Sequence, residues 1–154
     1  MERPGIWIRS VDAGIVGASE ALFPENDLGA PDWRDVEMLP RTRRWLAALP
    51  AKQRLLVELL FVAVEWVTPL LGPAPGRFSK IAPARREAIV RRWRASRIYP
   101  LKLLGDALKA TVSMIYLSHP AALRHIGLYK PCATPGDPLE VEVRPDALAA
   151  EVAS

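Results

Sequence analysis

The sequence predicts an all-α fold, a compact bundle of five or six helices with proline-rich loops and an extended C-terminal tail. Half of the 154 residues are hydrophobic, and they recur at the spacings of three and four residues that are typical of helices. The 15 prolines, about double the usual ~5%, fall between these apolar blocks and separate them into short helices. The length favours one domain, for which we expect an arm at 1–9, a helical body at 10–130 and a tail at 131–154.

The first half of the body is expected to hold two helices on either side of an acidic loop. The first begins at Ser10 or Asp12, either of which can cap it, and ends before Pro24. The loop at residues 24–32 lacks the ligand spacing of an EF-hand, so a surface or interface loop is favoured over a metal site. Asp32 then caps a helix over residues 33–49, which Pro40 is expected to kink or break.

The third expected helix follows Pro50 and is apolar around most of its circumference. Glu58, Glu65 and Pro69 interrupt this run, so a buried central helix is favoured over a membrane span. Glu58 and Glu65 share one face, which could meet arginines of the next helix or of a partner. They are weak candidates for a catalytic pair, because no acid, base or nucleophile accompanies them.

Prolines also open the next two helices. Pro83 suits the first turn of an arginine-rich helix reaching residue 97, and Pro100 that of a helix ending before Pro120. A short turn at 122–126 is closed by Gly127, a residue suited to a left-handed C-cap. The apolar stripe expected on the Pro100 helix comprises Leu101, Leu104, Leu108, Val112 and Ile115.

The histidines and the cysteine do not form a recognisable reactive site. His119 and His125 lie six residues apart with a proline between them, unlike the i, i+4 pair of a zinc helix. We expect His119 to act as a cation at the end of its helix. Cys132, the single cysteine, excludes an internal disulfide and a cysteine-rich metal site. No catalytic, cofactor-binding or metal-binding residue is expected in this chain.

The tail is expected to lack a core of its own. Residues 139–143 alternate between apolar and acidic side chains and suit one short strand, which needs the sheet edge of another protein as a partner or stays extended. Residues 146–152 suit a final short helix or a frayed end.

The net charge of +4 comes mainly from arginine and fits nucleic acid, anionic lipid or an acidic protein. Glu87 interrupts the arginines of the Pro83 helix and no reader motif follows, so nucleic acid is not favoured. A peripheral membrane contact remains an alternative. Arginine is also enriched at protein interfaces, where its planar fork pairs with carboxylates. The arginines of this stretch are Arg85, Arg86, Arg91, Arg92, Arg94 and Arg97.

Two stretches resemble known families. The pattern R-E…W-x-x-S-R…K…S-H-P…I-G-x-Y-x-P, from residue 86 to residue 131, is similar to a helical segment near the N-terminus of long-chain alcohol oxidases of the glucose–methanol–choline family. Residues 22–31, LFPENDLGAP, resemble the non-flavin subunit 3 of gluconate 2-dehydrogenase-type enzymes. The resemblance covers roughly residues 10–132, and Phe78 stands where these families carry a phenylalanine that anchors the next helix.

The resemblance implies a non-catalytic small subunit that folds with and stabilises a flavin-dependent alcohol or sugar dehydrogenase or oxidase. FAD is expected in the large partner subunit and not in this chain, which lacks a glycine-rich dinucleotide fingerprint. Subunit 3 proteins often carry a twin-arginine export signal, from which this N-terminus departs, so the expected compartment is the cytoplasm. The alternative is a stand-alone basic helical module for nucleic acid or an anionic membrane surface.

The expected contacts with a partner combine aromatic residues, arginines and the tail. Tryptophan and arginine are the residues most often found at the energetic centres of interfaces. A corollary is that the chain alone exposes apolar patches and associates. The expected interface residues are Trp7, Trp33, Arg86, Arg92, Trp93, Arg97, Tyr129, Cys132, Val141 and Val143.

Overall fold

The computed structural model describes residues 5–71 and 76–127, of which 69–71 are described by their backbone alone. All regular structure in these residues is helical. The all-α prediction is therefore confirmed for this part of the chain. The helices are α1 (Gly5–Leu22), α2 (Met38–Ala48), α3 (Ala51–Leu71), the 3-10 helix η1 (Phe78–Lys80), α4 (Pro83–Arg94), α5 (Tyr99–Leu117) and α6 (Pro120–His125).

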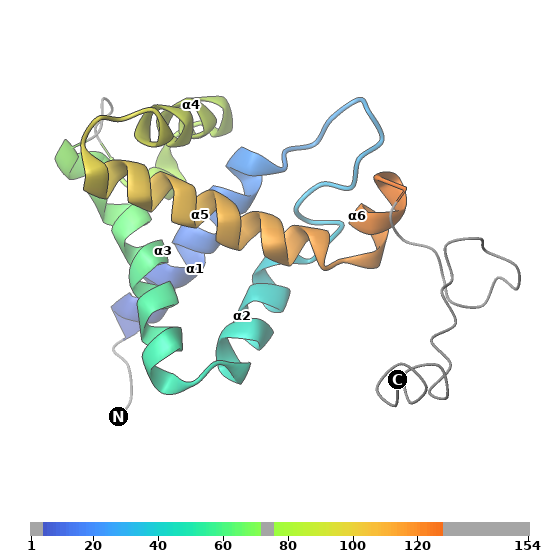
Figure 1. Ribbon diagram of the computed structural model, residues 1–154, viewed down its shortest axis with the longest axis horizontal. Coiled ribbons are helices and arrows are strands. Elements are labelled where there is room, and N and C mark those ends of the chain that lie inside the picture. The colour runs from blue at the N-terminus through green and yellow to red at the C-terminus, as the bar shows by residue number, and fades with distance from the viewer. Residues whose placement is uncertain (1–4, 72–75, 128–154) are drawn as a thin grey trace, which may run out of the picture.

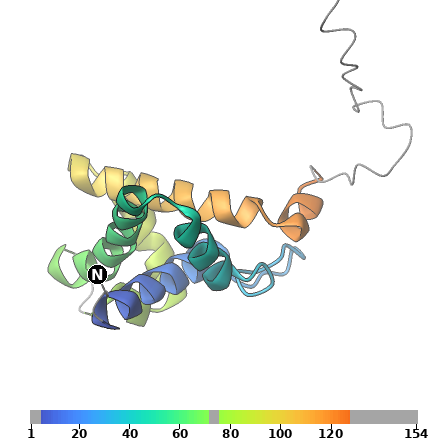
Figure 2. The same cartoon turned by 90° about the horizontal axis from the view of Figure 1, so that it is seen from below.

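Helix α1 is the centre of the bundle. It packs against α2, α3, α4, α5 and η1, and α5 crosses the bundle on the side facing the viewer in Figure 1. Small residues permit these close approaches: a Cβ placed on Gly14 would lie 2.4 Å from the carbonyl oxygen of Phe61 in α3. In Figure 2, α5 runs along the upper edge of the bundle and α1 lies below it, and the two helices are in contact. A small-residue helix therefore holds the larger side chains of its neighbours around it.

The prediction of an extended arm at residues 1–9 is wrong for residues 5–9, which form the first turns of α1. Trp7 explains the difference, because its ring packs against the core and its indole N–H donates to Glu58 on α3 at 2.8 Å. This tertiary contact stabilises the first turns of the helix. The predicted end before Pro24 is confirmed at Leu22.

The second helix is shorter than predicted, because residues 33–37 form a turn before α2 begins at Met38. The carboxylate of Asp32 accepts hydrogen bonds from the backbone N–H groups of Arg34 and Asp35 at 2.6 and 2.9 Å, so it caps this turn instead of the helix. Pro40 consequently falls in the first turn of α2, where its missing N–H breaks no helical bond. The predicted kink at Pro40 is wrong.

Helix α3 begins after Pro50 as predicted, but it is not the buried central helix. Phe61 and Val64 are fully buried against the core, whereas the opposite side of α3 remains at the surface. Within the described residues, no helix is long and apolar enough to cross a membrane.

The C-terminal half follows the sequence closely. Pro83 and Pro100 lie in the first turns of α4 and α5, and α4 ends at Arg94, three residues before the expected end. Gly105 lets the two helices touch, since a Cβ there would lie 2.8 Å from the side chain of Arg94. The predicted stripe on α5 is confirmed, with Leu108, Val112 and Ile115 buried. Gly127 closes α6 with φ 74°, as expected.

Candidate interaction surface

Helices α3 and α5 each carry an apolar stripe on the side away from the core. On each helix the exposed side chains recur at multiples of the helical spacing, so they share one side of the helix. Leu56 is 67% exposed and Tyr99 is 72% exposed, far more than a core residue. The α3 stripe comprises Leu55, Leu56, Leu59 and Trp66, and the α5 stripe comprises Tyr99, Leu103, Met114 and Leu117.

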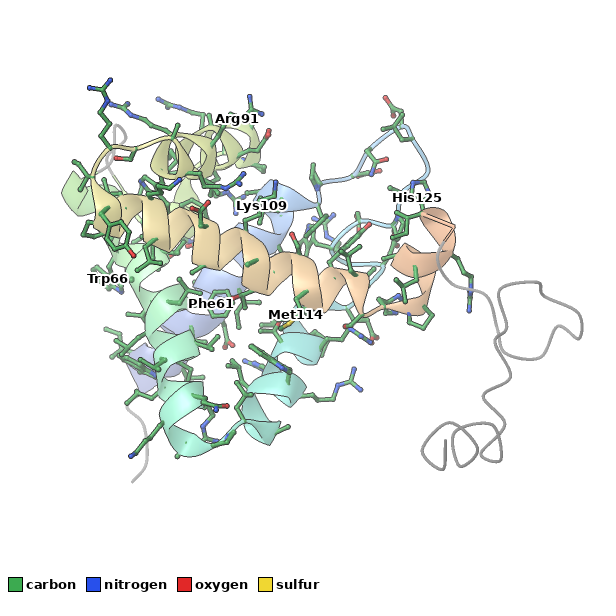
Figure 3. The ribbon with its side chains drawn as sticks, in the orientation of Figure 1. Phe61, Trp66, Arg91, Lys109, Met114 and His125 are labelled. Atoms are coloured by element: carbon green, nitrogen blue, oxygen red, sulfur yellow. The ribbon has the colours of Figure 1, made fainter. Side chains whose placement is uncertain are left out.

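A groove of about 470 Å³ lies between α2 and α5. Met114 points from α5 toward α2 in Figure 3, and Trp45 lines the groove from α2. The guanidinium of Arg41 donates to the backbone oxygen of Ser118 at 3.0 Å and to its hydroxyl at 2.8 Å, which joins the two sides. Arg44 is well exposed, with Glu37 3.9 Å away. The lining residues of this α2–α5 groove are Arg41, Arg44, Trp45, Met114, Ile115 and Ser118.

A smaller cavity of about 170 Å³ lies where α1, α2 and α3 meet. Its charged side chains have partners within the cavity: the guanidinium of Arg43 bonds the carboxylate of Asp12, and the carboxylate of Glu58 accepts from the indole of Trp7 with Arg54 4.0 Å away. The hydrogen bond and the charge of Asp12 raise the pKa of Arg43. With its charges already paired, this cavity is an internal junction between helices.

The two glutamates of α3 face the core and do not meet the arginines of α4, contrary to expectation. Glu65 is 1% exposed and accepts hydrogen bonds from the backbone N–H and the hydroxyl of Ser79, at 2.9 and 2.7 Å. Glu58 bonds Trp7, with Arg54 4.0 Å away. Glu65 thus anchors η1 against α3, and Glu58 anchors the start of α1.

Two residues expected at a partner interface are internal instead. Arg86 and Trp93 are each 3% exposed. Arg86 donates to the carbonyl oxygen of Gly17 at 2.9 Å and to the carboxylate of Glu20 at 2.5 Å, which ties α4 to α1. The ring of Trp93 stacks near that of Phe78, with centroids 5.9 Å apart. The prediction that Trp93 is exposed is wrong, because it completes the buried face of α4.

The sequence contained a signal for this burial. Arg86, Ile89, Val90 and Trp93 recur at spacings of three and four, so they share one face of α4. A lone arginine on that face needs an internal carboxylate and carbonyl, and α1 supplies both. Phe78 is fully buried beside them, which confirms the expected anchor.

The other expected interface residues that the structure describes lie on different elements. Trp7 is half-buried at the start of α1, and Trp33 is half-buried before α2 with the guanidinium of Arg34 4.8 Å from its ring. Arg92 and Arg97 are exposed at the end of α4 and just beyond it. Tyr129, Cys132, Val141 and Val143, and the strand expected at 139–143, lie outside the described residues.

His119 has a different role from the one predicted. Its Nδ1 accepts a hydrogen bond from the backbone N–H of Ala121 at 3.1 Å, so it caps the start of α6. An accepting Nδ1 must be unprotonated, so the prediction of a cation at the end of α5 is wrong. Burial, followed by the charge of Arg41, lowers the pKa of His119 and favours this neutral form.

Among the described residues, no three His, Cys, Asp or Glu side chains are grouped so that they could hold a metal ion. The features left for recognition are the two apolar stripes and the α2–α5 groove. No protein-family model, curated protein or solved structure matches the chain.

Proposed function

We propose that this chain is the non-catalytic small subunit of a flavin-dependent alcohol or sugar dehydrogenase or oxidase. It folds with the large subunit and stabilises it, and the large subunit carries the FAD. The observation that supports this proposal is the α3 stripe, in which Leu55, Leu56 and Leu59 remain exposed on the longest helix of the bundle. The family resemblance of residues 10–132 names the class of partner.

The two sides of α3 differ in what they contribute to the fold. The side bearing Phe61 and Val64 already stabilises the bundle, so the leucines on the opposite side contribute little to this chain's own fold. Burying apolar area against another protein contributes roughly 25 cal/mol per Å². A surface of this kind is typical of a subunit interface, where leucine and tryptophan lose water on association.

The α5 stripe extends the proposed interface. Met114 and Leu117 lie on the exposed side of the helix whose other side contains the buried Leu108 and Val112. Helices with two apolar sides are expected in a protein that is covered by a partner.

The proposed compartment of the complex is the cytoplasm.

The alternative, a basic module for nucleic acid or an anionic membrane surface, draws on three exposed cations. Arg91 and Arg94 of α4 pair with Glu87 and Asp106, and Arg86 is buried. The exposed arginines of this region without a carboxylate partner in the described part of the chain are Arg85, Arg92 and Arg97. Binding to DNA that weakens steeply with salt would support this alternative.

The test is purification of the tagged chain from its native host, followed by an absorbance spectrum and mass spectrometry. The proposal predicts a yellow sample that contains a flavoprotein in a fixed ratio to this chain. A colourless sample without a flavoprotein would contradict it, and one rich in nucleic acid would favour the basic module.

A further inference from the structure

We propose that residues 139–143 of the C-terminal tail bind in the α2–α5 groove of the same chain. The sequence of this segment is Leu-Glu-Val-Glu-Val. The proposal concerns the free chain and is independent of the proposed flavoprotein partner. The α2–α5 groove combines an apolar floor with arginines, and residues 139–143 are its proposed occupant.

Charge favours this occupant. The C-terminal segment 128–154, which includes the tail, carries five carboxylate side chains against the cations Lys130 and Arg144, a net charge of −3. The chain as a whole carries +4, so residues 1–127 carry +7. The acidic tail is therefore attracted to the basic body. At physiological salt this attraction acts over separations up to about a Debye length, ~8 Å. The carboxylates of the tail are Asp137, Glu140, Glu142, Asp146 and Glu151.

The alternation of the segment matches the groove. In an extended chain, successive side chains point to opposite sides, so Val141 can enter the groove while Glu140 and Glu142 point back toward its rim. The floor offers Trp45 and Met114 to the valine. A segment with apolar and acidic residues in register therefore suits this surface better than a purely apolar segment does.

Arg44 is the cation most available to the segment. Its side chain is 71% exposed, and its only carboxylate within reach in the described residues, Glu37, lies 3.9 Å away. Arg41 donates hydrogen bonds to Ser118 and forms part of the wall of the groove. It adds positive charge there without giving up these hydrogen bonds. A carboxylate of the segment can thus approach Arg44 without breaking a strong ion pair.

The groove is close in sequence to the start of the C-terminal segment. Ser118 lines the groove, and α6, which packs on α5, begins two residues later and ends at His125. Twelve steps of chain separate Gly127 from Leu139, a reach of roughly 40 Å when extended. Such a short connection gives the segment a high effective concentration at the groove, so a weak contact suffices to hold it.

The experiment uses the full chain with a nitroxide on a cysteine introduced at Ala147, in a Cys132→Ser background. Paramagnetic broadening of backbone amides is measured by NMR. We expect broadening at Trp45 and Met114 that exceeds the broadening at Arg91 and Arg92 of α4 several-fold. Equal broadening at the groove and at α4 would overturn the proposal.

Charge variants test the specific contact. Glu140→Lys with Glu142→Lys should abolish the excess broadening at the groove, and adding Arg44→Glu should restore part of it. The matched control, Asp146→Lys with Glu151→Lys, makes the same change of charge outside the segment and should retain the broadening. If the control loses as much broadening as the Glu140→Lys, Glu142→Lys variant, the tail is attracted to the body by its net charge alone. That result would overturn the proposal.

A mixed sample separates the tail of the same chain from that of a second copy. Isotope-labelled chains without nitroxide are combined with unlabelled chains that carry it. The proposal predicts no broadening at Trp45 in this mixture, whereas broadening would assign the groove to another copy and contradict the intramolecular contact.

Discussion

At the scale of single residues, buried polar groups bind the helices to one another. Arg86 joins α4 to α1 through Gly17 and Glu20, and Glu65 joins α3 to η1 through Ser79. Both carboxylate oxygens of Glu65 accept hydrogen bonds, and the two terminal nitrogens of Arg86 donate them while its buried Nε has no partner among the described residues. From the sequence alone, Arg86 and Glu65 resemble surface charges, because the residues that they bind are distant in the chain.

His119 provides a pH-dependent prediction. Its pKa is lowered by burial and by Arg41, so the folded state binds a proton on this residue less readily than the unfolded state does. The stabilisation from neutral His119 is complete above the unfolded pKa, about 6.5, and is lost as pH falls from there through the folded pKa. His119→Asn keeps a capping side chain and should remove this part of the pH dependence of the free energy of unfolding.

Urea unfolding at several pH values between about 4 and 8 measures the effect. His125→Asn, at the exposed end of α6, is the matched control for the replacement of a histidine by asparagine. A pH profile of His119→Asn that coincides with that of the unaltered chain would contradict the capping role.

At the scale of elements, the close approach of α1 and α3 depends on Gly14. A Cβ there would lie 2.4 Å from the backbone oxygen of Phe61, and backbone cannot move aside as a flexible side chain can. We therefore expect Gly14→Ala to lower the free energy of unfolding by about 1–3 kcal/mol. Gly5→Ala meets nothing closer than 4.0 Å and should be neutral or stabilising. Equal stabilities of the two variants in urea would contradict the packing of α1 on α3.

The elements were predictable where a proline marks a helix start. Pro50, Pro83 and Pro100 each precede or open a helix, because proline fits the first turn. The start of α1 was missed because a contact with Glu58, 51 residues away, holds Trp7 in the helix. The start of α2 was missed because Asp32 caps a turn, and a capping residue does not reveal whether a turn or a helix follows.

Helix α3 shows why the candidate surface was only partly predictable. A helix that is apolar on all sides indicates burial, but the pattern does not say whether the same chain or another protein covers each side. Here Phe61 faces the core and Leu56 faces outward. Conversely, Trp93 suggested an interface by its residue type, while the spacing of its neighbours indicated the core.

At the scale of the whole molecule, the core and the proposed partner interface lie on different sides of the helices. The core around α1 holds the fold, and the outer sides of α3 and α5 carry the apolar stripes. Surface substitutions away from the core usually change stability by less than about 0.5 kcal/mol. The proposed partner binding can therefore be measured separately from folding in this chain.

The most direct test of the proposed subunit role compares two leucine variants. Leu56→Glu lies in the α3 stripe and is 67% exposed, and Leu28→Glu lies in the loop before α2 and is 84% exposed. Both place the same charge on an exposed leucine, and both should fold like the unaltered chain by circular dichroism.

The quantity to measure is the amount of flavin retained per tagged chain after purification from the native host. A charge at the centre of an apolar interface costs at least about 1.4 kcal/mol, a factor of ten in affinity. We predict that Leu56→Glu lowers the retained flavin about tenfold or more while Leu28→Glu retains it. Equal retention by the two variants would contradict docking through α3, and no flavin with the unaltered chain would contradict the subunit role itself.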